Sequence, residues 1–76
     1  SFHLIAGAFQ FKENAKNKVK LLKEKGFDSK IIGTNKWGLT QVSFNSYSTR
    51  NQATKDLYKI RKTISKDAWL LIKKGN

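Results

Sequence analysis

The residues of this chain that could do chemistry point to binding rather than to catalysis. Its 76 residues include one histidine, His3, and five acidic residues, but no cysteine. The acids show none of the pairing that general acid–base catalysis uses. They are Glu13, Glu24, Asp28, Asp56 and Asp67. No glycine-rich phosphate loop or nucleophile elbow is present. The sequence therefore predicts a protein that is not an enzyme, with no catalytic residues, no cofactor and no metal site.

The most unusual segment is DAWLLIK, from Asp67 to Lys73, which has five apolar residues in a row near the end of a polar chain. A strand points alternate side chains to opposite faces, so this strand would be apolar on both. Parity alone leaves Trp69 open to two placements, in the core or on an exposed face. Trp37, in the turn segment TNKWG, can likewise serve a binding site or fold back over the core.

The charge balance is strongly basic, with sixteen lysines and arginines and a formal net charge of +11. Such an excess is typical of proteins with an anionic partner. Most of these charges fall on two predicted helices, however, and a solvated helical face is the simplest interpretation. No apolar run approaches a membrane span and no signal peptide is visible. Because the chain starts at Ser1 and has no methionine, we expect one domain cut from a longer protein, with any membrane or targeting segment elsewhere.

The chain repeats itself with an offset of 38 residues, which aligns Ala15 with Ala53. The two halves span about residues 2–38 and 40–74, and each reads as strand, helix, strand. The first predicted helix carries an apolar stripe at helical spacing and ends at Gly26, a residue typical of C-terminal caps. The second has a matching stripe and begins with Thr49 and Gln52, which have the spacing of a capping box. The stripes are Phe11, Ala15, Val19 and Leu22, then Ala53, Leu57, Ile60 and Ile64.

The resulting order, βαββαβ, predicts a ferredoxin-like (RNP-like) α+β sandwich: a four-stranded antiparallel sheet with two helices on one face. The other face, called the open face below, would be free of helices. Period-2 counting assigns to it both polar and apolar side chains, and an exposed apolar patch commonly marks a binding surface. His3 and Gln41 could both be ordinary solvated strand residues. The open-face residues are His3, Ile5, Asp28, Lys30, Ile32, Leu39, Gln41, Ser43, Trp69 and Leu71.

The segments HLIAGAF, WGLTQVSFNSYST and DAWLL, with their spacing, resemble the SPOR domain, a repeat of bacterial cell-envelope proteins. The likeness runs from Phe2 to Ile72. It implies a domain that binds peptidoglycan through the open sheet face, and we expect this domain to be a monomer. The implied ligand is the denuded glycan strand, from which amidases have removed the stem peptides at the division septum. The resemblance therefore implies a periplasmic, septal location.

The resemblance also implies a set of glycan-binding residues, several of which depart from the family pattern. Ile5 stands where the family has glutamine, two residues before the glycine of its G-S-F motif, and Ala8 stands in place of that motif's serine. Leu39 and Gln41 replace an aromatic residue and an arginine, and Trp37 would supply the missing aromatic. The apolar residue of the last strand matches Trp69.

The chemistry of a sugar ligand fits these residue types. The C–H faces of sugar rings stack on tryptophan, whereas hydroxyl and N-acetyl groups need partners such as Gln41 and Ser43. Removing a stem peptide frees a lactyl carboxylate, so a denuded strand is a polyanion. Three lysines near the rim of the sheet, Lys30, Lys36 and Lys73, are expected to pair with it.

Two rival functions share this architecture. An RNA-binding module of the RRM type would fit the basic charge, but RRMs stack bases on aromatics of the central strands, and GLTQVSF presents Leu39, Gln41 and Ser43 instead. We therefore expect no nucleic-acid partner. A protein–protein interaction module would bind a partner protein and ignore cell-wall material.

Overall fold

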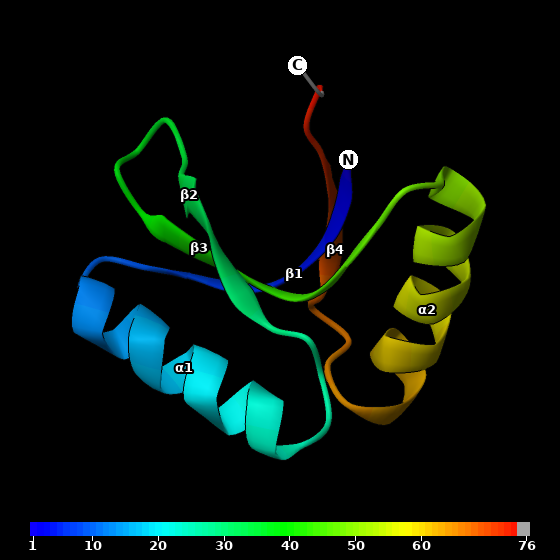
Figure 1. The fold of residues 1–76 in the computed structure, drawn as a ribbon, viewed down its shortest axis with the longest axis horizontal. Helices are drawn as coiled ribbons and strands as arrows, with labels where there is room; N and C mark the ends of the chain where they lie inside the picture. Colours follow the sequence, from blue (N-terminus) through cyan, green and yellow to red (C-terminus); the bar gives the residue numbers. More distant parts are fainter. Residues whose placement is uncertain (75–76) are drawn as a thin grey trace.

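A computed structural model describes residues 1–74 of the chain. Its elements are β1 (Phe2–Phe9), α1 (Lys12–Glu24), β2 (Lys30–Thr34), β3 (Thr40–Tyr47), α2 (Arg50–Thr63) and β4 (Trp69–Ile72). The strands form one antiparallel sheet in the order β2-β3-β1-β4. Both helices lie on the same side of this sheet (Figure 1). The predicted ferredoxin-like sandwich is confirmed.

The core lies between the helices and the sheet, and the internal repeat determines it. Ala15 and Leu22 of α1 are buried at the positions that Ala53 and Ile60 occupy in α2. The two small alanines allow each helix to approach the sheet closely. The sheet contributes buried residues from the two central strands, β1 and β3, and from the segment before β4. These are Leu4, Val42, Phe44 and Ala68.

The helix ends agree in part with the sequence. Gly26, with φ of 97°, follows the last turn of α1 in the left-handed conformation that was predicted. The Thr49 hydroxyl accepts a hydrogen bond from the Gln52 backbone N–H (3.3 Å), as a helix N-cap does. The assignment of Phe11 and Ile64 to the core stripes is wrong. Both occupy cap positions just outside the regular helix, and both are exposed.

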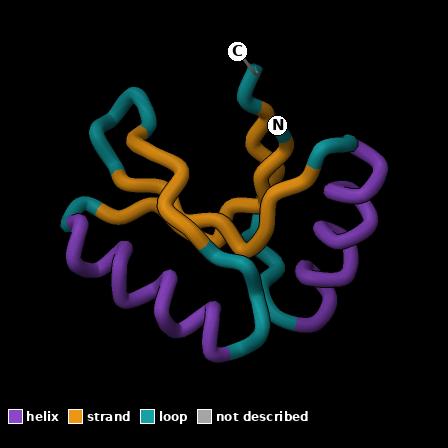
Figure 2. The backbone as a smooth tube through the Cα atoms, in the orientation of Figure 1, coloured by secondary structure: helices purple, strands orange, loops and turns teal. Residues whose placement is uncertain are grey.

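The sheet is irregular, and its irregularities bend it. The β1–β3 ladder changes register between Leu4 and Ile5 and again between Ile5 and Gly7, and the β2–β3 ladder changes between Ile31 and Gly33. Such bulges increase the local twist and bend the strands. In Figure 2 the hairpin of β2 and β3 rises on one side, and the start of β1 with the end of β4 rises on the other. Both rise on the side away from the helices.

The β1–β4 ladder continues past the strand ends into a last pair formed by Ser1 and Lys73. The Ser1 amine donates to the Lys73 carbonyl at 2.8 Å, and the Lys73 backbone N–H donates to the Ser1 carbonyl at 2.9 Å. The beginning of the chain and the end of β4 therefore lie side by side at one corner of the sheet (Figure 1).

Candidate functional site

One row of side chains crosses the open face over all four strands. Trp69 pairs with Ile5, Ile5 with Ser43, and Ser43 with Lys30. Directly paired residues in antiparallel strands point to the same face. Ala68, next to Trp69, is 1% exposed and belongs to the core, whereas Trp69 is 37% exposed. Trp69 therefore lies on the open face, and its placement in the core is excluded.

Two further rows flank the first. Leu71 pairs with His3, and His3 with Ser46; on the other side Ala8 pairs with Gln41, and Gln41 with Gly33. Strict alternation from Ile5 would turn Ala8 toward the helices. The bulge between Ile5 and Gly7 adds one residue to β1 and so places Ala8 beside Gln41.

The middle of the open face is much less accessible than a flat sheet would be. Ile5 and Ser43 are 0% exposed, and Gln41 and His3 are 6% and 8% exposed. They lie outside the hydrophobic cluster under the helices, so what covers them lies on the open face of the bent sheet and not in the helical layer. The expectation that His3 and Gln41 could be solvated strand residues is wrong for this reason. Trp69 and Lys30, at the two edges of the central row, are the exposed members of that row.

Ser43 and Gln41 differ in how much hydrogen-bonding capacity they keep for a ligand. The Ser43 hydroxyl donates to the Lys30 carbonyl (3.3 Å), and the Ser43 carbonyl accepts from the Ser29 hydroxyl (2.6 Å). Within residues 1–74 no fully buried side-chain nitrogen or oxygen lacks a partner. The Gln41 amide, for which these residues supply none, therefore keeps access to solvent.

Trp37 lies in the loop that joins β2 to β3. The Asn35 side-chain carbonyl accepts hydrogen bonds from the backbone N–H groups of Trp37 and Leu39, both at 3.0 Å, and this fixes the loop. Trp37 is 73% exposed, so it does not fold back over the core. The Lys36 ammonium lies 4.7 Å from the centre of its ring. Since Trp69 is on the opposite edge strand, the structure does not bring the two tryptophans together in one row.

The cationic side chains of the open face gather around His3. The Lys73 ammonium donates to the backbone carbonyl of Ile32 at 2.9 Å, and a Cβ added to Gly33 would lie 3.4 Å from that ammonium. Burial lowers the pKa of His3 from its ordinary value, and the charges of Lys30 and Lys73 lower it further. The sequence indicated Lys30 and Lys73 as rim residues but gave no sign of His3 as their neighbour. Parity had placed His3 on this face, but neither its burial nor its proximity to these two lysines could be inferred from the sequence.

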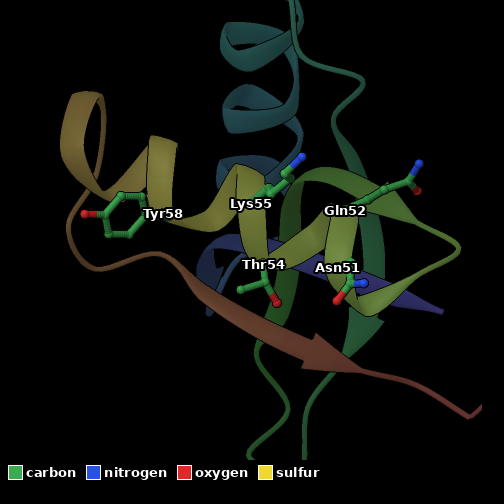
Figure 3. Close-up of a pocket in the computed structure, with 5 residues that line it drawn as sticks. All are labelled: Asn51, Gln52, Thr54, Lys55 and Tyr58. Atoms are coloured by element: carbon green, nitrogen blue, oxygen red, sulfur yellow. The ribbon is translucent and has the colours of Figure 1, made fainter.

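Other candidate sites are weak in the part of the chain that the structure describes. Its histidine and acidic residues form no group that could hold a metal ion. None of its helices has the length and apolar character needed to cross a bilayer. A hollow of about 630 Å³ is lined by exposed side chains of α2 alone: Asn51, Gln52, Thr54, Lys55 and Tyr58. Figure 3 shows them projecting in different directions from successive turns of the helix, so they do not converge on a common point.

A comparison with protein families identifies the family of this chain. A family model described as the SPOR domain matches residues 1–71, almost the whole chain. No curated protein and no solved structure gives a significant match. SPOR domains are non-catalytic peptidoglycan-binding modules found in cell-division proteins of the bacterial envelope. This chain, with its βαββαβ fold and the family pattern over residues 1–71, belongs to the SPOR domain family.

Proposed function

We propose that this domain binds denuded glycan strands of peptidoglycan on its open face. By doing so it would place the protein of which it is a part at the division septum, in the periplasm. The observation that carries the proposal is the position of Trp69, an exposed aromatic side chain on the open face of a peptidoglycan-binding fold. The domain acts as a monomer and needs no cofactor.

Trp69 offers what a sugar ring needs. Its indole pairs across the sheet with Ile5, and the next open-face residue of the same strand is Leu71. A sugar ring can lie on this apolar surface through its C–H groups. Gln41 is only 6% exposed, but its amide has no partner among residues 1–74 and would bond the sugar's hydroxyl or N-acetyl groups. Ile5 and Ser43 are buried, so they would shape the floor of the site and make little direct contact.

The preference for denuded strands would come from charge. Hydrolysis of the amide between muramic acid and its stem peptide releases a carboxylate, and the open face carries Lys30 and Lys73. Lys36 and Trp37 would reach the same strand from the loop between β2 and β3. An attached stem peptide removes the carboxylate and adds bulk above the bent sheet, which disfavours the intact strand.

The rival RNA-binding function finds no support in the placement of aromatic residues. RRMs stack bases on aromatic side chains of the two central strands. Here the central strands present His3, Ile5 and Ala8 from β1, and Gln41 and Ser43 from β3. The Phe and Tyr residues of these strands pack in or against the core, so a base has no Phe, Tyr or Trp on the open face of β1 or β3 to stack on.

The proposal is tested by co-sedimentation with purified sacculi, intact or treated with amidase. We expect enrichment on treated sacculi and about a tenfold loss of affinity in Trp69→Ala, in line with one or two kcal/mol for an aromatic contact. Tyr58→Ala is the matched control, since Tyr58 is exposed on α2, away from the open face. Equal binding to both sacculi would refute the denuded preference, and no binding to either would refute the function.

Raising the salt concentration should weaken binding, because the carboxylate contacts are exposed.

A further inference from the structure

We propose that His3, Lys30 and Lys73 form an anion subsite on the open face, where the imidazole takes up a proton as a carboxylate binds. The ligand's identity rests on the proposed function; the chemistry of the subsite does not. The binding of the domain to a carboxylated sugar would thereby become stronger as the pH falls.

The hydrogen bonding of His3 leaves one ring nitrogen for a ligand. Nδ1 lies 2.7 Å from the hydroxyl oxygen of Ser46, its partner across β1 and β3. A serine hydroxyl can donate to the neutral ring or accept from the protonated one, so this contact persists in both states. With the hydroxyl donating to Nδ1, the neutral ring carries its proton on Nε2. Protonation then adds a proton at Nδ1, and the Nε2–H of the charged ring becomes a stronger donor whose natural acceptor is a carboxylate oxygen.

Among residues 1–74, no acidic group pairs with the ammonium of Lys73. Its ammonium has three donors, and the structure gives it one partner, the neutral carbonyl of Ile32. Gly33 contributes no side chain at this point; a Cβ there would come within 3.4 Å of the ammonium. A carboxylate could therefore share the ammonium with the Ile32 carbonyl or replace that carbonyl.

The charged groups around His3 are all cationic. They are Lys30 from β2, Lys73 just after β4, and the amine of Ser1, which precedes β1. The β3 residue that bonds His3, Ser46, is neutral. Together with burial they disfavour the imidazolium, so the ring is neutral at pH 7. A bound carboxylate would offset this repulsion and raise the pKa of His3. By linkage, protonation of His3 must then strengthen carboxylate binding by the same factor.

The test follows the single histidine of the chain by NMR titration. Denuded glycan oligomers should raise the pKa of His3, whereas N-acetylglucosamine oligomers, which lack the carboxylate, should not. We expect affinity for the denuded oligomer to increase about threefold to tenfold between about pH 8 and pH 5. His3→Gln should abolish that increase, and Lys30→Met or Lys73→Met should reduce the rise in pKa. Lys16→Met on α1 is the matched control.

The outcomes separate the subsite from the proposed function. If denuded glycan binds but the pKa of His3 does not change, the subsite is refuted and the glycan function stands. If glycan does not bind, sodium lactate is the remaining probe, since it carries the same carboxylate. A rise in pKa with lactate that depends on Lys30 and Lys73 supports the subsite without the glycan function. An equal rise in Lys16→Met, Lys30→Met and Lys73→Met, or no rise at all, refutes it.

Discussion

The ammonium group of Lys73 donates a hydrogen bond to the backbone carbonyl of Ile32, 41 residues away and on the opposite edge of the sheet. In a flat sheet the edge strands β2 and β4 would lie about 14 Å apart, at three strand spacings. The bonds of a lysine side chain, about 1.5 Å each, add up to well under that distance. The contact therefore requires the bent, twisted sheet, whose corners rise on the side of the open face (Figure 2). The Lys73 side chain thus bridges the two edges of the open face at one point.

Removing the Lys73 contact should loosen the open face with little effect on overall stability. We expect Lys73→Met to cost about 0.5–1 kcal/mol, because an exposed hydrogen bond to a neutral carbonyl contributes little net free energy. Amide hydrogen exchange at Lys30–Thr34 and Trp69–Ile72 should become faster. Lys74→Met, one residue further along and exposed, is the control. Unchanged exchange in both variants would show that the bulges alone hold the corners in place.

Gly33 should tolerate no side chain. Its φ of 129° lies where L-residues are strained, and it forms part of the β2 bulge next to the Lys73 ammonium. We expect Gly33→Ala to lower the free energy of unfolding by about 1–3 kcal/mol, measured by denaturant titration. Gly38→Asn is the comparison, since φ of 78° at Gly38 is close to a region that asparagine enters at modest cost. A loss no larger at Gly33 than at Gly38 would contradict this account.

Tyr47 should make the domain sensitive to alkaline pH. Burial, and then the hydrogen bond that its hydroxyl donates to the Asp56 carboxylate at 2.5 Å, raise its pKa above the ordinary value. The stabilisation is therefore complete below about pH 10 and is lost as the pH rises toward the folded-state pKa. Tyr47→Phe should cost about 1–2 kcal/mol at neutral pH and remove this alkaline loss. Tyr58→Phe, on the exposed side of α2, should leave both unchanged.

His3 should make the ligand-free domain less stable in acid. Because burial and neighbouring cations lower its folded-state pKa, the unfolded chain takes up the proton first. The stability that neutral His3 contributes is present above about pH 7 and is lost as the pH falls through the folded-state pKa. Denaturant titrations between about pH 8 and pH 5 should show this loss in the wild-type chain and not in His3→Gln. The same loss in both would assign it to other groups.

The fold could be predicted because its signals are local and repeated. Ala15 and Ala53 stand at the same point of two apolar stripes, and both are 0% exposed between helix and sheet. Gly26 follows the end of α1 because its positive φ, 97°, is a backbone conformation that glycine adopts without strain. Phe11 and Ile64 continue the same spacing by one step, but a helix buries its stripe only over the turns that face the sheet. Periodicity does not say where that contact ends.

For the candidate site, the sequence could predict which side chains lie on the open face, but not how the sheet arranges or covers them. Counting by twos correctly placed Trp69, Gln41 and Lys30 on it. It could not predict that a bulge would add Ala8 to this face, because the register of a ladder depends on both strands. Nor could it show that Ile5 and His3 are covered, since bending is a property of the whole sheet. The glycan-binding roles of these residues remain predictions that the sacculus experiment addresses.

The pairing of Ser1 with Lys73 also determines how the domain would respond to a mechanical load. A force that pulls these two residues apart acts along their hydrogen bonds rather than across a set of bonds in parallel. It would open the β1–β4 ladder like a zipper, from Ser1 and Lys73 toward Ile5 and Trp69. The domain should therefore extend at low force when pulled from these two points, and β4, the edge strand that carries Trp69, would detach first.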